Sequence, residues 1–267
     1  METFLCFLMI ALYHFSVLLI FLDKNLSNLY NYTMLKITNL NYSVLEKDSK
    51  KDILKDINID FNSGKTYCIT GPNGSGKSTL VKIIIGILRQ TDGNIVFDGK
   101  DISNLEIDQR ANLGISFAFQ KPVTFKGLKV RDLLDIASGK KNDFSSVCSY
   151  LSEVGLCAKD YINRYIDDNL SGGELKRIEI AMALARKCKL NIFDEPEAGI
   201  DLWSFDNLTE LFSSLKDCCN IIVSHQRKIL EMADCIVLLK DGVIEKVGTL
   251  SELEPYLQKP TCARLAR

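Results

Sequence analysis

A glycine-rich stretch of eight residues has the spacing that wraps a peptide backbone around a phosphate group. It follows the apolar run at residues 66–70 and consists of Gly71, Pro72, Asn73, Gly74, Ser75, Gly76, Lys77 and Ser78. Glycines let successive N–H groups turn inward around an anion, and the start of a helix adds a favourable dipole. We therefore expect this phosphate loop, with Thr79, to bind ATP. Lys77 would reach the β- and γ-phosphates, and the Ser78 hydroxyl would ligate Mg²⁺.

Two adjacent carboxylates, Asp194 and Glu195, follow a second apolar run at residues 190–193. At the end of a strand, Asp194 can hold Mg²⁺ directly or through water, and Glu195 can polarise a water molecule that attacks the γ-phosphate. Alone, the pair would be an ordinary strand end with solvated acids. A phosphate loop in the same chain favours the chemical interpretation. Asn191 is unexpected, because it is a polar residue inside a strand that should be buried.

A third candidate, the signature segment, opens a helical pattern at residues 172–187 and consists of Leu170, Ser171, Gly172, Gly173 and Glu174. A serine hydroxyl and glycine amides at the start of a helix form a second anion site. A serine before a helix is also a common N-cap. Two successive glycines exceed what a cap requires, so we expect this segment to bind an anion as well.

The elements around these residues predict an α/β fold. Predicted strands cover residues 35–44, 53–61, 66–70, 94–97, 115–119, 190–193, 220–223 and 235–239, and predicted helices cover 78–88, 129–138, 144–154 and 172–187. Alternation of strands and helices favours a mostly parallel sheet that is covered on both faces. A hairpin at the start and a helical block in the middle indicate two lobes.

Composition narrows the possible partners. The chain has 267 residues, enough for one large domain or two small ones, and a formal net charge of −1, so nucleic acid is not expected as the main partner. Nine cysteines are scattered without a Cys-x-x-Cys pair, which predicts neither a disulfide framework nor a zinc site. A reduced, cytoplasmic compartment fits best.

The N-terminal segment, residues 1–33, differs from the rest because residues 3–22 are almost continuously apolar and carry no charge. About 20 apolar residues can span a bilayer, so one interpretation is a membrane anchor. Another is a misassigned start, with the protein beginning at Met34 and residues 34–40 forming its first strand. A secretory signal fits poorly, because Glu2 stands where positive charge is typical. A targeting segment of another kind is the third interpretation.

Taken together, the motifs resemble those of the ABC family of ATPases from about Met34 to the C-terminus. They occur in the family's order: the phosphate loop, Gln120, the signature segment, Phe193–Pro196, Ala198–Asp201 and His225. The resemblance implies a phosphate-loop ABC nucleotide-binding domain at residues 34–267. Its parts would be a mixed, mainly parallel sheet core, an antiparallel β-subdomain and a small helical lobe at about residues 121–170.

The same resemblance implies that two copies pair head to tail around two ATP molecules. Ser171, Gly172, Gly173 and Glu174 would then complete the site formed by the phosphate loop of the other copy. Gln120 would touch Mg²⁺ and link the site to the helical lobe, and Asp201 would line the dimer seam. His225 would contact the γ-phosphate and steady the water near Glu195. Tyr42 is the candidate for stacking on adenine, and a packing tyrosine is the alternative.

A narrower resemblance follows Gln120. Phe-Ala-Phe-Gln-Lys-Pro-Val at residues 117–123, with Phe-Lys-Gly-Leu at 125–128, is similar to the SufC family, the ATPases of SUF iron–sulfur cluster assembly. Residues 195–201 depart from typical SufC proteins and fit compact variants. This implies a soluble SufB-like scaffold as partner, which would carry the cluster ligands. The alternative is an importer ATPase with a separate membrane permease. A third class is an ATP clamp that does not hydrolyse.

Overall fold

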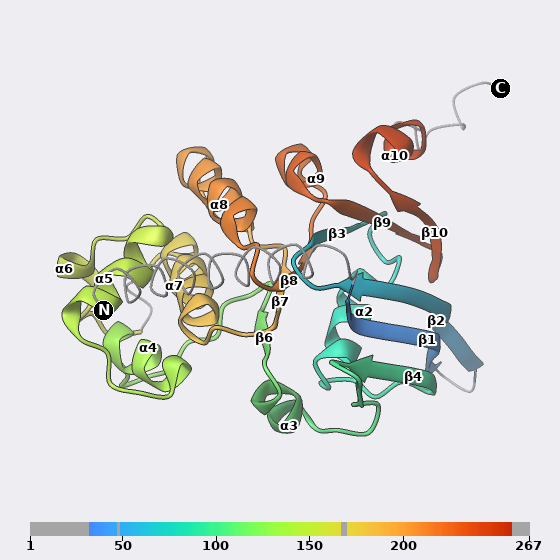
Figure 1. Ribbon diagram of the computed structural model, residues 1–267, viewed down its shortest axis with the longest axis horizontal. Coiled ribbons are helices and arrows are strands. Elements are labelled where there is room, and N and C mark those ends of the chain that lie inside the picture. The colour runs from blue at the N-terminus through green and yellow to red at the C-terminus, as the bar shows by residue number, and fades with distance from the viewer. Residues whose placement is uncertain (1–31, 47–48, 167–169, 258–267) are drawn as a thin grey trace, which may run out of the picture. The chain divides into compact units, whose positions relative to one another are not determined.

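The computed structural model describes residues 32–46, 49–166 and 170–257 (Figure 1), and the chain divides into two units, Met1–Thr33 and Met34–Arg267. The apolar stretch interpreted as an anchor or a misassigned start lies outside the described residues. Within the described ranges, no helix is long and apolar enough to cross a membrane.

A six-stranded sheet forms the centre of the second unit, with strand order β10-β9-β3-β8-β7-β6. Its strands are β3 (Thr66–Thr70), β6 (Ile115–Ala118), β7 (Leu190–Asp194), β8 (Cys219–Val223), β9 (Cys235–Lys240) and β10 (Val243–Gly248). All neighbours are parallel except β10, which runs antiparallel to β9. The strands β3, β7 and β8 are buried along their whole length and are mostly apolar, as is typical of a covered parallel sheet.

A second sheet has four strands in the order β2-β1-β4-β5. They are β1 (Thr33–Glu46), β2 (Ser49–Asn62), β4 (Asp92–Phe97) and β5 (Lys100–Asp101), and β4 pairs antiparallel with both β1 and β5. Side chains of this sheet, of helix α2 (Lys77–Ile84) and of one face of the central sheet form one hydrophobic cluster, which includes Leu35, Ile69 and Leu80.

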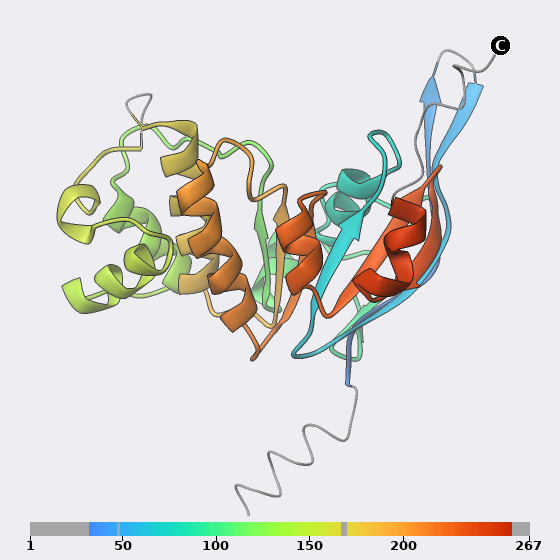
Figure 2. The ribbon, with the colours of Figure 1, turned by 90° about the horizontal axis from the view of Figure 1, so that it is seen from above.

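The other face of the central sheet is covered by helices. They are α7 (Gly172–Ala185), α8 (Leu202–Ser214), α9 (Arg227–Met232) and α10 (Leu250–Leu257). Three more helices complete the helical lobe by packing on the outer side of α7: α4 (Val130–Ser138), α5 (Phe144–Glu153) and α6 (Ala158–Tyr161). Figure 2 shows α8, α9 and α10, in orange to red, side by side along this face. Phe193 and Ile222 of the sheet pack with Phe212 of α8 in the second cluster. The predicted α/β fold is confirmed.

Two local features differ from the sequence-based expectation. The helix predicted at residues 78–88 ends at Ile84, and Gly86 then turns the chain with a φ of 86°. Two short helices, α3 (Ile107–Asn112) and α6, were not predicted, because four to six residues give no clear periodicity.

The unexpected Asn191 belongs to a buried polar row that crosses four neighbouring strands. Thr66, Asn220, Asn191 and Ser116 are aligned in register on β3, β8, β7 and β6. The Ser116 hydroxyl donates to Asn191 Oδ1 at 2.7 Å, Asn191 Nδ2 donates to Asn220 Oδ1 at 3.2 Å, and Asn220 Nδ2 donates to Thr66 Oγ1 at 3.3 Å. Each amide therefore has partners that offset its burial.

Candidate functional site

The predicted site residues follow or end four parallel strands at one edge of the central sheet. The phosphate loop follows β3, His225 follows β8, Asp194 ends β7, and Gln120 lies just beyond β6. These strands are successive neighbours in the order β3-β8-β7-β6. Because carboxyl ends of parallel strands meet at one edge, the fold brings these side chains together where open α/β sheets bind ligands.

The phosphate loop has the form of an anion cradle. The Lys77 ammonium group curls back and donates to the carbonyl oxygens of Gly71, at 2.7 Å, and Pro72, at 2.9 Å. Gly71 has a φ of 143°, and a Cβ there would lie 1.9 Å from the Leu239 oxygen, so only glycine fits. The Ser75 hydroxyl is buried without a hydrogen-bond partner among the described residues. An unpaired donor inside a glycine loop fits a phosphate oxygen as ligand.

Lys77 and the two carboxylates interact electrostatically. Burial lowers the pKa of Lys77, and the charges of Glu195 and Asp194 oppose that shift. Burial also raises the pKa of Asp194, and the adjacent charge of Glu195 raises it further. The Ser78 hydroxyl donates to Asp194 Oδ1 at 3.4 Å. These two oxygens could hold Mg²⁺, which prefers such ligands and would relieve the repulsion between the carboxylates.

Glu195 is turned out of the strand by its backbone. Its φ of 45° is left-handed, which is uncommon for a residue with a side chain, and its N–H donates to the Val223 oxygen at 2.9 Å. Gln120 Nε2 donates to Glu195 Oε2 at 2.6 Å. The geometry therefore links the end of β6 to the carboxylate that follows β7.

The signature segment opens α7 as a capping box. The Ser171 hydroxyl accepts from the Glu174 N–H at 3.2 Å, and the Glu174 carboxylate accepts from the Ser171 N–H at 2.6 Å. A Cβ on Gly173 would lie 2.6 Å from the Gly199 oxygen, so the segment packs directly against the stretch that leads to Asp201. Ser171 and Gly172 are exposed, and in the described part of the chain no hydrogen bond or ion pair joins residues 171–174 to the phosphate loop.

Three other candidates have simpler environments. Asp201 is the N-cap of α8, where its carboxylate accepts from the Ser204 N–H at 3.0 Å and the Ser204 hydroxyl at 2.7 Å. His225 is exposed beside buried Ser224. Tyr42 lies in β1, half-buried against the hydrophobic cluster that also contacts α2. Its stacking on adenine stays a prediction.

Comparison with known proteins identifies the family. The family model described as ABC transporter matches residues 54–198. The chain belongs to the ABC transporter family. As an ABC ATPase it binds and hydrolyses ATP. It is 36% identical over 219 residues to an uncharacterized ABC transporter ATP-binding protein of Methanocaldococcus jannaschii, covering 78% of this chain and 88% of that protein.

Other relatives of this ABC ATPase are named as transport proteins. A probable ATP-dependent transporter, ycf16, of Pyropia yezoensis is 32% identical over 82% of this chain and 92% of its own length. A sulfate/thiosulfate import ATP-binding protein of Pseudomonas putida is 32% identical over 75% and 63%. A solved ATP-binding cassette dimer bound to ADP and Pi has a TM-score of 0.74 at 24% identity, over 81% of this chain and 99% of that one. That structural similarity supports the ABC fold.

One charged residue of the ABC ATPase was not singled out from the sequence. Lys176 of α7 is fully buried, and its ammonium group donates to the Phe119 oxygen and to the Asp194 oxygen, the latter at 3.3 Å. It also pairs with Glu179 at 3.4 Å, and Glu179 accepts from the Phe119 N–H at 2.8 Å. The lysine therefore joins the helical lobe to the ends of β6 and β7. The sequence held no clear signal for this role, because Lys176 lies off the face formed by Leu175, Ile178 and Met182.

Proposed function

We propose that this ABC ATPase closes as a head-to-tail dimer in the cytoplasm and drives a conformational change in a soluble SufB-type scaffold for iron–sulfur cluster assembly. The chemistry of one subunit begins at the phosphate loop, where Gly71 to Thr79 bind the phosphates and Lys77 neutralises their charge. Tyr42 stacks on the adenine. Ser78, Asp194 and Gln120 hold Mg²⁺, which, when bound, neutralises the phosphate oxygens as charge develops on them.

The remaining groups of the subunit act on the attacking water. Glu195 orients and polarises it from a position fixed by its left-handed backbone and by the hydrogen bond from Gln120. His225 contacts the γ-phosphate and steadies the same water. Since Gln120 donates to Glu195, a shift of the loop after β6 changes the position of the carboxylate.

The second copy completes the pocket. Ser171, Gly172, Gly173 and Glu174 lie on an exposed helix start that makes no polar contact with its own phosphate loop in the described residues. A helix N-terminus with free amides favours an anion. In the dimer the Ser171 hydroxyl and the backbone amides of Gly172 and Gly173 contact the γ-phosphate held by Lys77 of the other copy, and Asp201 lies along the seam beside Gly199.

An apolar groove supports the scaffold as the partner. It has a volume of about 300 Å³ and lies among α3, α4, α7 and the loop after Gln120. Val123 and Phe125 of that loop are 46% and 41% exposed, and Ile136 of α4 is 65% exposed. These loop residues belong to the stretch that resembles SufC. We propose that an apolar segment of the scaffold docks here, where Val123 lies three residues after Gln120, so that docking and closure are coupled.

Affinity purification with mild cross-linking tests the choice of partner. We expect the wild-type chain to recover a soluble SufB-like protein, and Phe125→Glu to lose it while Phe144→Glu, at an exposed position of α5 outside the groove, keeps it. Recovery of a multi-span membrane protein instead would contradict the proposal. That outcome would support the alternative, the ATP-binding subunit of an importer coupled to a separate permease, which the name of the Pseudomonas putida import protein favours.

A further inference from the structure

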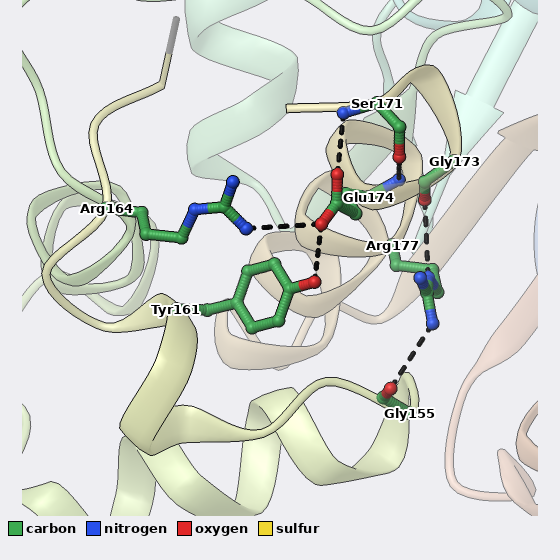
Figure 3. Close-up of polar contacts among 7 residues, drawn as sticks. All are labelled: Gly155, Tyr161, Arg164, Ser171, Gly173, Glu174 and Arg177. Carbon is green, nitrogen blue, oxygen red and sulfur yellow. Dashed lines mark hydrogen bonds and ion pairs between the residues drawn. The ribbon is translucent and has the colours of Figure 1, made fainter. Parts of the chain in front are cut away.

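The carboxylate of Glu174 is held from outside its own helix (Figure 3). In addition to the hydrogen bond from the Ser171 N–H, the carboxylate accepts one of 2.5 Å from the Tyr161 hydroxyl. It also forms an ion pair of 3.2 Å with Arg164 Nη1. The Arg164 guanidinium also lies over the Tyr161 ring, 5.0 Å from its centroid. An ordinary capping box needs only the serine and the glutamate. The additional donors therefore fix a side chain that a cap alone would leave free to move.

Tyr161 and Arg164 are themselves fixed by the backbone of the helical lobe. Tyr161 ends α6, and the chain that follows it pairs with the start of α4. The Val130 N–H donates to the Arg164 oxygen at 3.0 Å, and the Arg131 N–H donates to the Ile162 oxygen at 3.2 Å. Because its backbone is bonded on both sides of Arg164, this stretch presents the two side chains from a defined position.

The contacts favour one charge state of the carboxylate. The Tyr161 hydrogen bond is the main cause that lowers the pKa of Glu174 to about 2, and the Ser171 and Arg164 contacts act in the same direction. Glu174 is ionised at neutral pH, as an unperturbed glutamate also is, so its carboxylate oxygens only accept hydrogen bonds. Its Oε2 must then accept from the Ser171 N–H, which sets the backbone direction of Ser171 and leaves its hydroxyl at the exposed helix start.

A second brace holds the opposite side of the same helix start. Arg177 Nη1 donates to the Gly155 oxygen at 3.2 Å and to the Ser204 hydroxyl at 3.3 Å, and its Nε donates to the Gly173 oxygen at 3.4 Å. Gly173 is thus tied to α8, whereas Glu174 is tied to α6.

We propose that Tyr161 and Arg164 are positioning residues that hold Glu174, and through it Ser171, in the orientation that meets the nucleotide of a second copy. This inference rests on the proposed head-to-tail pairing. Neither residue touches ATP in its own subunit. Their loss should therefore lower turnover in the dimer without weakening the binding of ATP to the isolated chain, because the phosphate loop makes those contacts.

The test compares Tyr161→Phe with the matched control Tyr165→Phe. Tyr165 is 52% exposed, and the Lys129 ammonium group, rather than Glu174, lies over its ring. We expect Tyr161→Phe to lower kcat roughly tenfold, the factor that corresponds to one lost hydrogen bond to a charged group. The ATP dissociation constant of the monomer should stay close to wild type, although loss of the hydrogen bond lowers the thermal midpoint. Tyr165→Phe should keep the wild-type kcat and the wild-type thermal midpoint. In a Glu174→Ala background, Tyr161→Phe should have no further effect.

Two results would overturn the inference, and a third separates it from the proposed pairing. An unchanged kcat for Tyr161→Phe would overturn it, and so would an equal loss in Tyr165→Phe. In either case, a wild-type turnover per chain that rises with protein concentration would leave the pairing intact. A turnover independent of concentration would overturn the pairing itself, and the inference with it.

Discussion

The side-chain amide of Gln120 donates a hydrogen bond of 2.6 Å to the carboxylate of Glu195. The two residues follow neighbouring parallel strands, so the sheet itself sets their separation. Gln120 also begins the loop whose exposed Val123 and Phe125 line the groove. A single bond therefore joins the surface proposed for the scaffold to the carboxylate proposed to activate water.

Replacing Glu195 by Gln should separate ATP binding from turnover. The amide keeps a hydrogen-bonding group beside Gln120 but removes the charge that polarises water, so we expect turnover to fall by about 10²–10⁴ with ATP binding retained. Phosphate release measures this, with Glu231→Gln, at an exposed position of α9, as the control. Full turnover in Glu195→Gln would contradict the proposed role of Glu195 in activating water.

The pKa of Glu174 should show directly whether Tyr161 and Arg164 hold its carboxylate. Its pKa lies near 2 rather than at the ordinary 4.5, so the stability it contributes is fully present above pH 4.5 and is lost as the pH falls towards 2. The side-chain carboxyl resonance in ¹³C NMR should therefore titrate far below 4.5 in the wild type. In Tyr161→Phe, which removes the largest cause, it should move back towards 4.5. Identical titration curves would contradict the assignment of that cause to Tyr161.

Interrupting the buried polar row at Asn191 should lower the stability of the fold. Asn191→Ala leaves the Ser116 hydroxyl and the Asn220 amide oxygen each without one buried partner, so we expect the free energy of unfolding to fall by about 1–3 kcal/mol. Urea denaturation measures it. Asn112→Ala, at an exposed end of α3, should change the same quantity by less than about 0.5 kcal/mol. Equal effects of the two substitutions would show that the row contributes no special stability.

The catalytic edge of the sheet was predictable because each of its motifs directly follows or ends an apolar strand that the sequence displays. Asp194 and the phosphate loop could be placed at one edge from the β-α alternation alone. Contacts between distant segments could not be derived in this way. Asn191 finds its partners on strands that are 29 and 75 residues away, and nothing in the local pattern specifies that register.

The contacts that hold the signature segment could not be predicted from the sequence either. Tyr161 belongs to a four-residue helix that gives no periodic signal, and its pairing with Glu174 depends on how the helical lobe folds back on α7. Lys176 was hidden for a related reason, since a lysine in a helix is usually solvated, whereas this one is fully buried against two strand ends.

Sedimentation of the Glu195→Gln variant with ATP and Mg²⁺ tests the paired site most directly. Slow hydrolysis should trap the closed form, so we predict a monomer without ATP and a dimer with it. Adding Ser171→Arg, which blocks the exposed helix start but leaves the phosphate loop untouched, should leave ATP binding intact and abolish the dimer. A Glu195→Gln chain that stays monomeric at saturating ATP, or a Ser171→Arg double variant that still dimerises, would contradict a pocket completed by Ser171 of a second copy.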